Sequence, residues 1–170
     1  MSGSNTMVSA AGMQIPTEGR TMARYLEDFK PGDRYETASV ELTEEMIFEF
    51  AGQYDPQPFH LSRDAAHNSL FKGLAASGWH VAALTMGLVV RAGLDIANGL
   101  IGIDATLRWP RPTRPGDILR VTVDILEAHA SHSHPGWGIV RMRWTTANQN
   151  NEILAEIVPD CWVQARPAGT

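Results

Sequence analysis

Hydrophobic residues recur along this chain at two different periods, which separates a helical first half from a strand-rich second half. Between positions 44 and 54 apolar residues return every three or four positions and predict a helix with one buried face. From Trp79 to about Ala97 apolar residues surround nearly the whole predicted helix, a pattern typical of burial on most sides. Alternation of apolar and polar residues predicts strands over 101–107, 118–128, 137–147 and 153–164.

Capping and turn residues predict where several of these elements begin and end. Thr43 suits the N-cap of the 44–54 helix, whose first turn carries two glutamates. A strand is expected over 34–42, and a short helix over 62–70 with Ser62 as its N-cap. The elements together predict an α+β fold in which a curved antiparallel sheet wraps around one long central helix. That helix needs more apolar cover than one small sheet gives, so dimerisation through the sheet edge or the helix face is expected.

Length and composition limit the possible classes of protein. The chain has 170 residues and a formal net charge of −5, which argues against a nucleic-acid binder because phosphate contacts need a basic surplus. A single cysteine, Cys161, excludes an internal disulfide and a cysteine-rich zinc site. Residues 1–21 are small, polar and without period, so we expect a disordered N-terminal extension before a single domain over 22–170. We find no signal peptide or membrane span and therefore expect a cytoplasmic protein.

The densest group of chemically useful residues lies between Asp55 and His60. Asp55 and Gln57 each precede a proline, which disfavours helix and predicts a stiff, extended loop. Such a loop can aim the carboxylate of Asp55 and the imidazole of His60 at one water molecule, an arrangement suited to proton transfer. A purely structural interpretation, with Asp55 capping a turn and His60 satisfied at a helix entry, stays open on this spacing alone.

A second group of imidazoles has a spacing that metal sites also use. His129, His132 and His134 precede a Pro-Gly turn, and imidazoles at such intervals can bind zinc or nickel. They fall at a predicted hairpin tip with no cysteine near them, which favours a solvated loop. We therefore predict no metal site.

The order of motifs resembles a known family. The segment Ala51-Gly-Gln-Tyr-Asp55-Pro-Gln57-Pro-Phe-His60, followed by Gly73-Leu-Ala-Ala-Ser77-Gly78-Trp, is similar to the MaoC-like dehydratases, which include (R)-specific enoyl-CoA hydratases. The similarity spans roughly residues 24–166 and implies the hot-dog fold. Three departures are Gln57, where the family usually has asparagine, Tyr54, where a small residue is common, and Met86, near the position where some hydratases carry a serine in the long helix.

The resemblance implies roles for individual residues. Asp55 and His60 would form the catalytic pair that activates water, and the Gly78 N–H would bind the thioester oxygen. A glycine at a helix N-terminus allows that approach, because its N–H is unpaired and lies in a favourable dipole field. Gln57 and Ser77 are further candidates for substrate contact.

The function that we expect is a hydro-lyase acting on enoyl-CoA or 3-hydroxyacyl-CoA, in fatty acid metabolism. Arg108 and Arg111 lie in an Arg-Pro segment and are candidate contacts for the phosphates of coenzyme A, although a solvated, stiff connection is the simpler interpretation. No metal or redox cofactor is expected, and coenzyme A enters only as part of the substrate. The expected assembly is a homodimer or a higher oligomer built from dimers. A hot-dog acyl-CoA thioesterase and a non-catalytic acyl-thioester binder are the alternatives.

Overall fold

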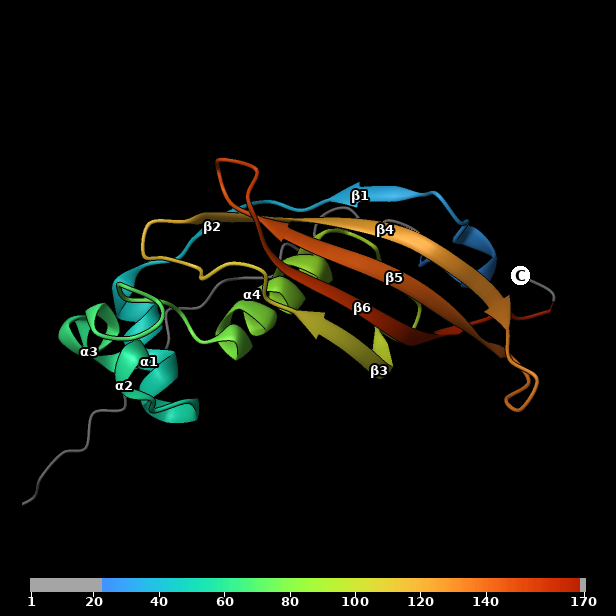
Figure 1. The fold of residues 1–170 in the computed structure, drawn as a ribbon. Coiled ribbons are helices and arrows are strands. Elements are labelled where there is room, and N and C mark those ends of the chain that lie inside the picture. Colours follow the sequence, from blue (N-terminus) through green and yellow to red (C-terminus); the bar gives the residue numbers. More distant parts are fainter. Residues whose placement is uncertain (1–22, 169–170) are drawn as a thin grey trace, which may run out of the picture.

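A computed structural model describes residues 23–168 and shows one antiparallel sheet lying over a long helix (Figure 1). The expected N-terminal extension lies outside the described residues. The helical elements are η1 (Leu26–Asp28), α1 (Glu44–Tyr54), α2 (Pro58–Leu61), α3 (Arg63–His67) and α4 (Gly78–Arg91). The strands are β1 (Arg34–Glu36), β2 (Val40–Glu41), β3 (Ile101–Arg108), β4 (Ile118–Ala130), β5 (Trp137–Ala147) and β6 (Ile153–Gln164).

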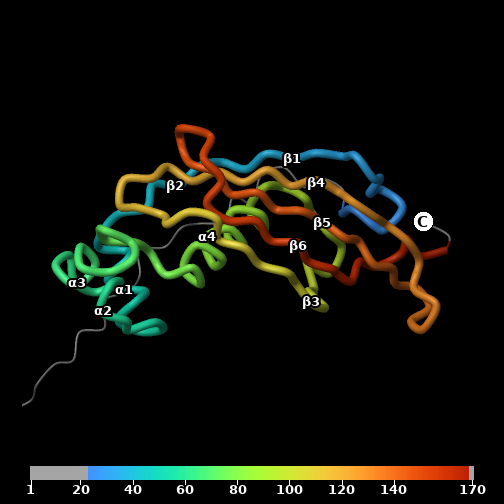
Figure 2. The backbone as a smooth tube through the Cα atoms, viewed as in Figure 1, coloured from blue at the N-terminus to red at the C-terminus, as the bar shows by residue number. Residues whose placement is uncertain are grey.

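The four strands predicted in the second half of the chain are confirmed and form the body of the sheet. The strand order is β1-β4-β5-β6-β3, and β2 pairs with β4 beyond the end of β1. All the strand pairs are antiparallel, as the alternating pattern predicted. The backbone tube shows α4 running beneath this sheet while α1, α2 and α3 gather beyond one end of it (Figure 2).

The inward-facing residues of β4 and β5 provide the core against α4. Side chains of Val121, Val123, Val140, Met142 and Trp144 are buried, and they alternate with more exposed neighbours along each strand. They pack with residues from the second half of α4 in one cluster. A second cluster joins α1, α3 and the first half of α4. The N-terminus of α4 therefore lies where the helical group meets the sheet.

Three predicted elements differ from the observed ones. The expected strand over 34–42 is two short strands, β1 and β2. The long helix ends at Arg91 rather than near Ala97, because Gly93 (φ +71°) and Asp95 (φ +43°) adopt left-handed backbone conformations that no α-helix continues through. The expected helix over 62–70 is confirmed in type but is shorter, at Arg63–His67.

The prediction that the long helix is buried on most sides is wrong for the isolated chain. Trp79, Met86 and Val90 are 61%, 40% and 61% exposed on α4. Met86 shares a cavity wall with residues of β3, an edge strand of the sheet, most of whose residues are also exposed. None of the helices among residues 23–168 is both long enough and apolar enough to cross a membrane.

Candidate active site

Two consecutive helices position the carboxylate of Asp55 and the imidazole of His60. The α1 helix begins at its predicted cap, where Thr43 Oγ1 accepts a hydrogen bond from the Met46 N–H, and it ends at Tyr54. Asp55 follows as the C-cap and donates its own N–H to the Ala51 carbonyl, 3.0 Å away. His60 lies in the single turn of α2. The expected extended loop over 55–60 is thus wrong in its second half: Pro58 occupies the first position of α2, where a helix does not need an N–H.

The two side chains converge. His60 Nε2 lies 3.4 Å from Asp55 Oδ2. His60 Nδ1 lies 2.7 Å from the carbonyl oxygen of Ala75, which can only accept, so Nδ1 carries the proton in this hydrogen bond. In the neutral ring Nε2 then has a free lone pair, and it faces the carboxylate. Two acceptors at this separation form a site for a water molecule that donates one hydrogen bond to each.

Asp55 is held in its ionised form by its neighbours. Its side chain is 16% exposed, and burial by itself raises the pKa of the carboxyl group. Hydrogen bonds from the Ser77 hydroxyl and the Gln57 amide, together with the nearby His60, outweigh that effect and lower the pKa of Asp55 below its ordinary value of 3.8. Gln57 Nε2 donates to Oδ1 over 2.7 Å, which leaves Oδ2 to face His60.

The N-terminus of α4 adds backbone donors beside this pair. Ser77 caps the helix by accepting from the Trp79 N–H at 3.2 Å. Among residues 23–168 no backbone carbonyl accepts from the Gly78 N–H, as is usual for the first turn of a helix. An added Cβ on Gly78 would lie 2.8 Å from the Trp109 ring. Glycine is therefore required here by packing, whatever its amide binds.

A cavity of about 530 Å³ connects these groups. Asp55, His60, Gln57 and Gly78 all line it, and Arg111 lies at its wall. Two aromatic groups bound it: Phe59 and Phe71 pack around His60, and Trp109 meets Trp79 edge to face with ring centroids 5.5 Å apart.

Two of the predicted contact residues do not line this cavity. Ser77 is only 1% exposed, so its hydroxyl acts on Asp55 and on the α4 backbone rather than facing the open space. Arg108 is exposed at the end of β3, outside the cavity wall.

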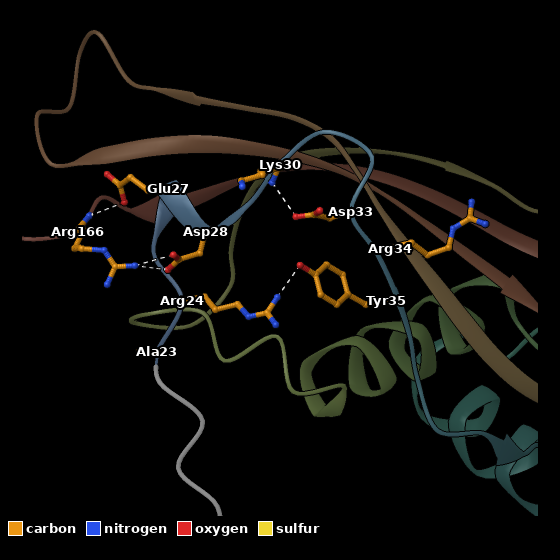
Figure 3. A pocket seen from close by; sticks show the side chains of 9 residues that line it. All are labelled: Ala23, Arg24, Glu27, Asp28, Lys30, Asp33, Arg34, Tyr35 and Arg166. Carbon is orange, nitrogen blue, oxygen red and sulfur yellow. Dashed lines mark hydrogen bonds and ion pairs between the residues drawn. The ribbon is translucent and has the colours of Figure 1, made fainter.

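Another cavity, of about 560 Å³, opens near β1 and η1 (Figure 3). Its charged side chains mostly satisfy one another: Arg166 pairs with Asp28 at 2.6 Å, and Arg24 donates to the Tyr35 hydroxyl at 2.6 Å. Arg34 pairs with Asp124 instead. No acid and base converge on an open position there, so the site beside Gly78 is the better candidate despite its slightly smaller volume.

The histidines of the predicted hairpin tip are all exposed: His129 lies near the end of β4, where it pairs with Ile139, and His132 and His134 lie in the loop between β4 and β5. His134 packs on Trp162, with ring centroids 4.8 Å apart. Within the described part of the chain no three histidine, cysteine, aspartate or glutamate side chains gather as metal ligands.

Sequence reasoning missed the contribution of the loop that follows α3. The Ala75 carbonyl determines which nitrogen of His60 carries the proton, and a backbone acceptor leaves no signal in the sequence. Phe71 contacts the His60 ring from the same loop, with centroids 6.0 Å apart. The aromatic side chain of Phe71 was the only feature of this loop in the sequence that could have indicated a contact with His60.

Fold and site together define a hot-dog protein with a carboxylate–imidazole pair at the N-terminus of its central helix. The family model for the MaoC like domain matches residues 28–146. The crystal structure of the MaoC-like dehydratase from Rhodospirillum rubrum superposes with a TM-score of 0.82 at 46% identity, covering 85% of this chain and 99% of that one. The chain belongs to the MaoC-like family.

Two curated relatives are more distant. The uncharacterized protein YdeM of Bacillus subtilis is 27% identical over 132 residues, which is 77% of this chain and 92% of that protein. The (R)-specific enoyl-CoA hydratase of Rhodospirillum rubrum is 31% identical over 102 residues, covering 59% and 69% of the two chains. The predicted resemblance and the hot-dog fold are thereby confirmed.

Proposed function

We propose that this protein is a hydro-lyase that adds or removes water across the α,β bond of an acyl-CoA thioester. The observation that carries the proposal is the pair of acceptors, Asp55 Oδ2 and His60 Nε2, 3.4 Å apart in a cavity that also contains the Gly78 amide. The (R)-specific enoyl-CoA hydratase among the relatives supports the same reaction class.

In the hydration direction, a water molecule donates to both acceptors. Its oxygen bonds to the β carbon of an enoyl thioester while His60 Nε2 takes the proton, and the ionised Asp55 orients the water and stabilises the imidazolium. The electron pair of the double bond moves toward the thioester oxygen, and the Gly78 N–H donates a hydrogen bond to the negative charge that develops there. The proton then passes to the α carbon, so that the product has gained the elements of one water. Dehydration is the reverse.

Other parts of the cavity fit a thioester substrate. Its aromatic walls accept an apolar acyl group, and Arg111 at its rim is a candidate contact for a coenzyme A phosphate. Coenzyme A is needed only as part of the substrate in this scheme, and no step uses a metal or a redox group. Cytoplasmic fatty acid metabolism stays a prediction.

We further propose that the protein works as a homodimer. Met86, on the exposed apolar face of α4, and Ile103, on the edge strand β3, line one shallow cavity, and a second copy would cover both.

The decisive measurement follows the absorbance of the enoyl-thioester band with a panel of enoyl-CoAs. Asp55→Asn keeps the size of the side chain and loses its charge, so we expect the fold to persist while turnover falls about 100- to 10,000-fold. Asp64→Asn, on α3, is the matched control and should leave turnover unchanged, since Asp64 lies outside the cavity lining.

The alternatives give different results in the same assay. Full activity of Asp55→Asn on the correct substrate would remove Asp55 from the mechanism. Release of free thiol without loss of the double bond would indicate a thioesterase instead, although α4 contains no carboxylate to serve one. Tight binding of acyl-CoA without turnover would indicate a binding protein.

A further inference from the structure

Arg114 binds the loop that supplies the backbone partner of His60. Its Nη1 donates to the carbonyls of Gly73 (2.6 Å) and Leu74 (2.9 Å), and its Nη2 donates to the carbonyl of Phe71. Among residues 23–168, every hydrogen bond from this guanidinium goes to this loop. The planar group offers several donors in fixed directions, so it holds three carbonyls in one relative geometry.

The residue after Leu74 is the one that contacts the candidate base. Ala75 is fully buried, and its carbonyl accepts a hydrogen bond from the His60 Nδ1–H over 2.7 Å. On its other side, the Ala76 N–H donates to the Thr113 carbonyl at 2.9 Å. The Ala75 peptide is therefore fixed between two anchors, both supplied by the adjacent residues 113 and 114.

Arg114 is itself held rigidly. Its backbone N–H donates to Asp117 Oδ2 at 2.7 Å, and the other oxygen of that carboxylate accepts from Asn148 at 3.0 Å. Asp117 and Asn148 are both buried. A continuous series of hydrogen bonds thus runs from the turn between β5 and β6, through Arg114, to the loop beside His60.

We infer that Arg114 is a positioning residue for His60. By fixing residues 71–75, hereafter the 71–75 loop, it places the Ala75 carbonyl so that His60 keeps its proton on Nδ1 and turns Nε2 toward Asp55. Its kinetic consequence depends on the proposed hydro-lyase function, whereas the link between Arg114 and the His60 ring does not. This assignment separates Arg114 from Arg111, which lines the cavity and has no such contacts with the loop.

Arg114→Gln tests the inference, with Arg114→Lys as a second variant. We expect kcat for enoyl-CoA hydration to fall about 10- to 100-fold with KM changed less than about twofold, because the base is displaced while the substrate wall remains. In ¹⁵N-labelled protein the His60 Nδ1–H signal should shift and exchange faster with water. Lysine keeps the charge but cannot bridge three carbonyls, so Arg114→Lys should lie between the wild type and Arg114→Gln in both measurements.

The control is Arg63→Gln. Arg63 is three residues from His60 and is also paired, but with Glu44 at 2.8 Å on the surface, so both readouts should stay as in the wild type. A folded Arg114→Gln with an unchanged His60 signal overturns the inference, as does a change in KM alone. If Arg114→Gln does not fold, Arg114→Lys decides by the same signal. A wild type without hydratase activity would refute the proposed function, and the His60 signal would still test the role of Arg114.

Discussion

At the scale of single residues, the Asp55 carboxylate has two oxygens with different neighbours. Oδ1 accepts from the Gln57 amide, and Oδ2 faces His60. Ser77 adds a hydroxyl donor, and that same hydroxyl accepts from the Trp79 N–H at the start of α4. The Ser77 hydroxyl therefore links the Asp55 carboxylate directly to the N-terminus of α4.

Ser77→Ala should change the pH dependence of the reaction. The Ser77 hydrogen bond lowers the pKa of Asp55, so its loss raises that pKa. The acid limb of kcat/KM against pH, which reports groups of the free enzyme, should therefore move to higher pH. The substitution should also lower the free energy of unfolding. Because the pKa of Asp55 is lower in the folded protein, its ionisation stabilises the fold above the unfolded pKa, and this stabilisation is lost as the pH falls through the folded pKa. Ser77→Ala reduces the difference between the two pKa values, so the variant should lose part of this stabilisation at neutral pH.

Ser62→Ala provides the control for the loss of a helix cap. Ser62 caps α3 by accepting from the Ala65 N–H, just as Ser77 caps α4, and each alanine should cost about 1 kcal/mol in cap energy. Of these two serines, Ser77 is the one that donates a hydrogen bond to Asp55. Equal acid limbs in the two variants would show that the hydroxyl of Ser77 does not act on the carboxylate.

The residues of the site were predictable to different degrees. Asp55 and His60 stand out in the sequence because their side chains carry chemistry and their motif resembles a family. The role of Gln57 as a donor to Asp55 was not predictable, since an amide serves a substrate or a neighbour equally well. Arg114 belongs to a series of arginines at a spacing of three, and only the fold shows that it binds backbone carbonyls.

At the scale of elements, the N-terminus of α4 is packed against the start of the connection from β3 to β4. The Trp109 indole lies on Gly78, so close that a methyl group on Gly78 would meet the ring at 2.8 Å. Trp109 is followed by two prolines within three residues, which restrict its backbone. The glycine and the indole thus form one packing unit at the mouth of the cavity.

Gly78→Ala should reduce stability and activity together. Overpacking of this kind costs about 1–3 kcal/mol, and displacement of Trp109 would disturb the cavity wall. The double variant Gly78→Ala/Trp109→Leu should recover much of both losses, because the new methyl group then has room and the backbone N–H of residue 78 is retained. Thermal unfolding and kcat for all three variants measure this as a double-mutant cycle.

Gly52→Ala is the control within a helix. Gly52 lies on α1, and an added Cβ there meets nothing within 4 Å, so the substitution should stabilise by about 0.5–1 kcal/mol. Additive effects of the Gly78 and Trp109 substitutions would contradict the packing unit and leave backbone flexibility as the reason for glycine at position 78.

Element boundaries were predictable where local signals decide them. The α1 helix begins after the predicted Thr43 cap and ends before the Asp55-Pro pair, as the sequence indicated. The α2 turn was missed because Pro58 gives two opposite signals. It disfavours a helical conformation for the residue before it, Gln57, but it also suits the first position of a helix, which it occupies here. The early end of α4 was missed because the buried Leu94 and Ala97 continue the apolar pattern beyond the last helical residue.

At the scale of the whole molecule, one apolar surface has no cover within the described chain. Its members are Trp79, Met86 and Val90 on α4, and Ile103 on β3. An exposed apolar face beside a free strand edge is unusual for a monomer, which would ordinarily protect both. The same face begins at Trp79, a residue of the cavity wall, so an associated second copy would lie next to the candidate active site.

Met86→Glu should therefore separate the proposed dimer into monomers. A carboxylate at the centre of this face would lose its hydration in the interface, a cost that association repays only with a compensating partner. Light scattering coupled to size exclusion, at micromolar concentration, measures the mass directly. Ile153→Glu is the matched control, because Ile153 has nearly the same exposure (42% against 40%) but lies at the start of β6, outside the face.

The comparison of the two variants separates a specific interface from general apolar association. A dimeric wild type, a monomeric Met86→Glu and a dimeric Ile153→Glu would place the interface on α4 and β3. If hydration activity also falls in the monomeric variant while its thermal stability is kept, the cavity needs the second copy to be complete. A monomeric wild type would refute the dimer, and α4 would then expose its apolar face to solvent in the working protein. Dissociation by both variants would show that apolar association is not confined to this face.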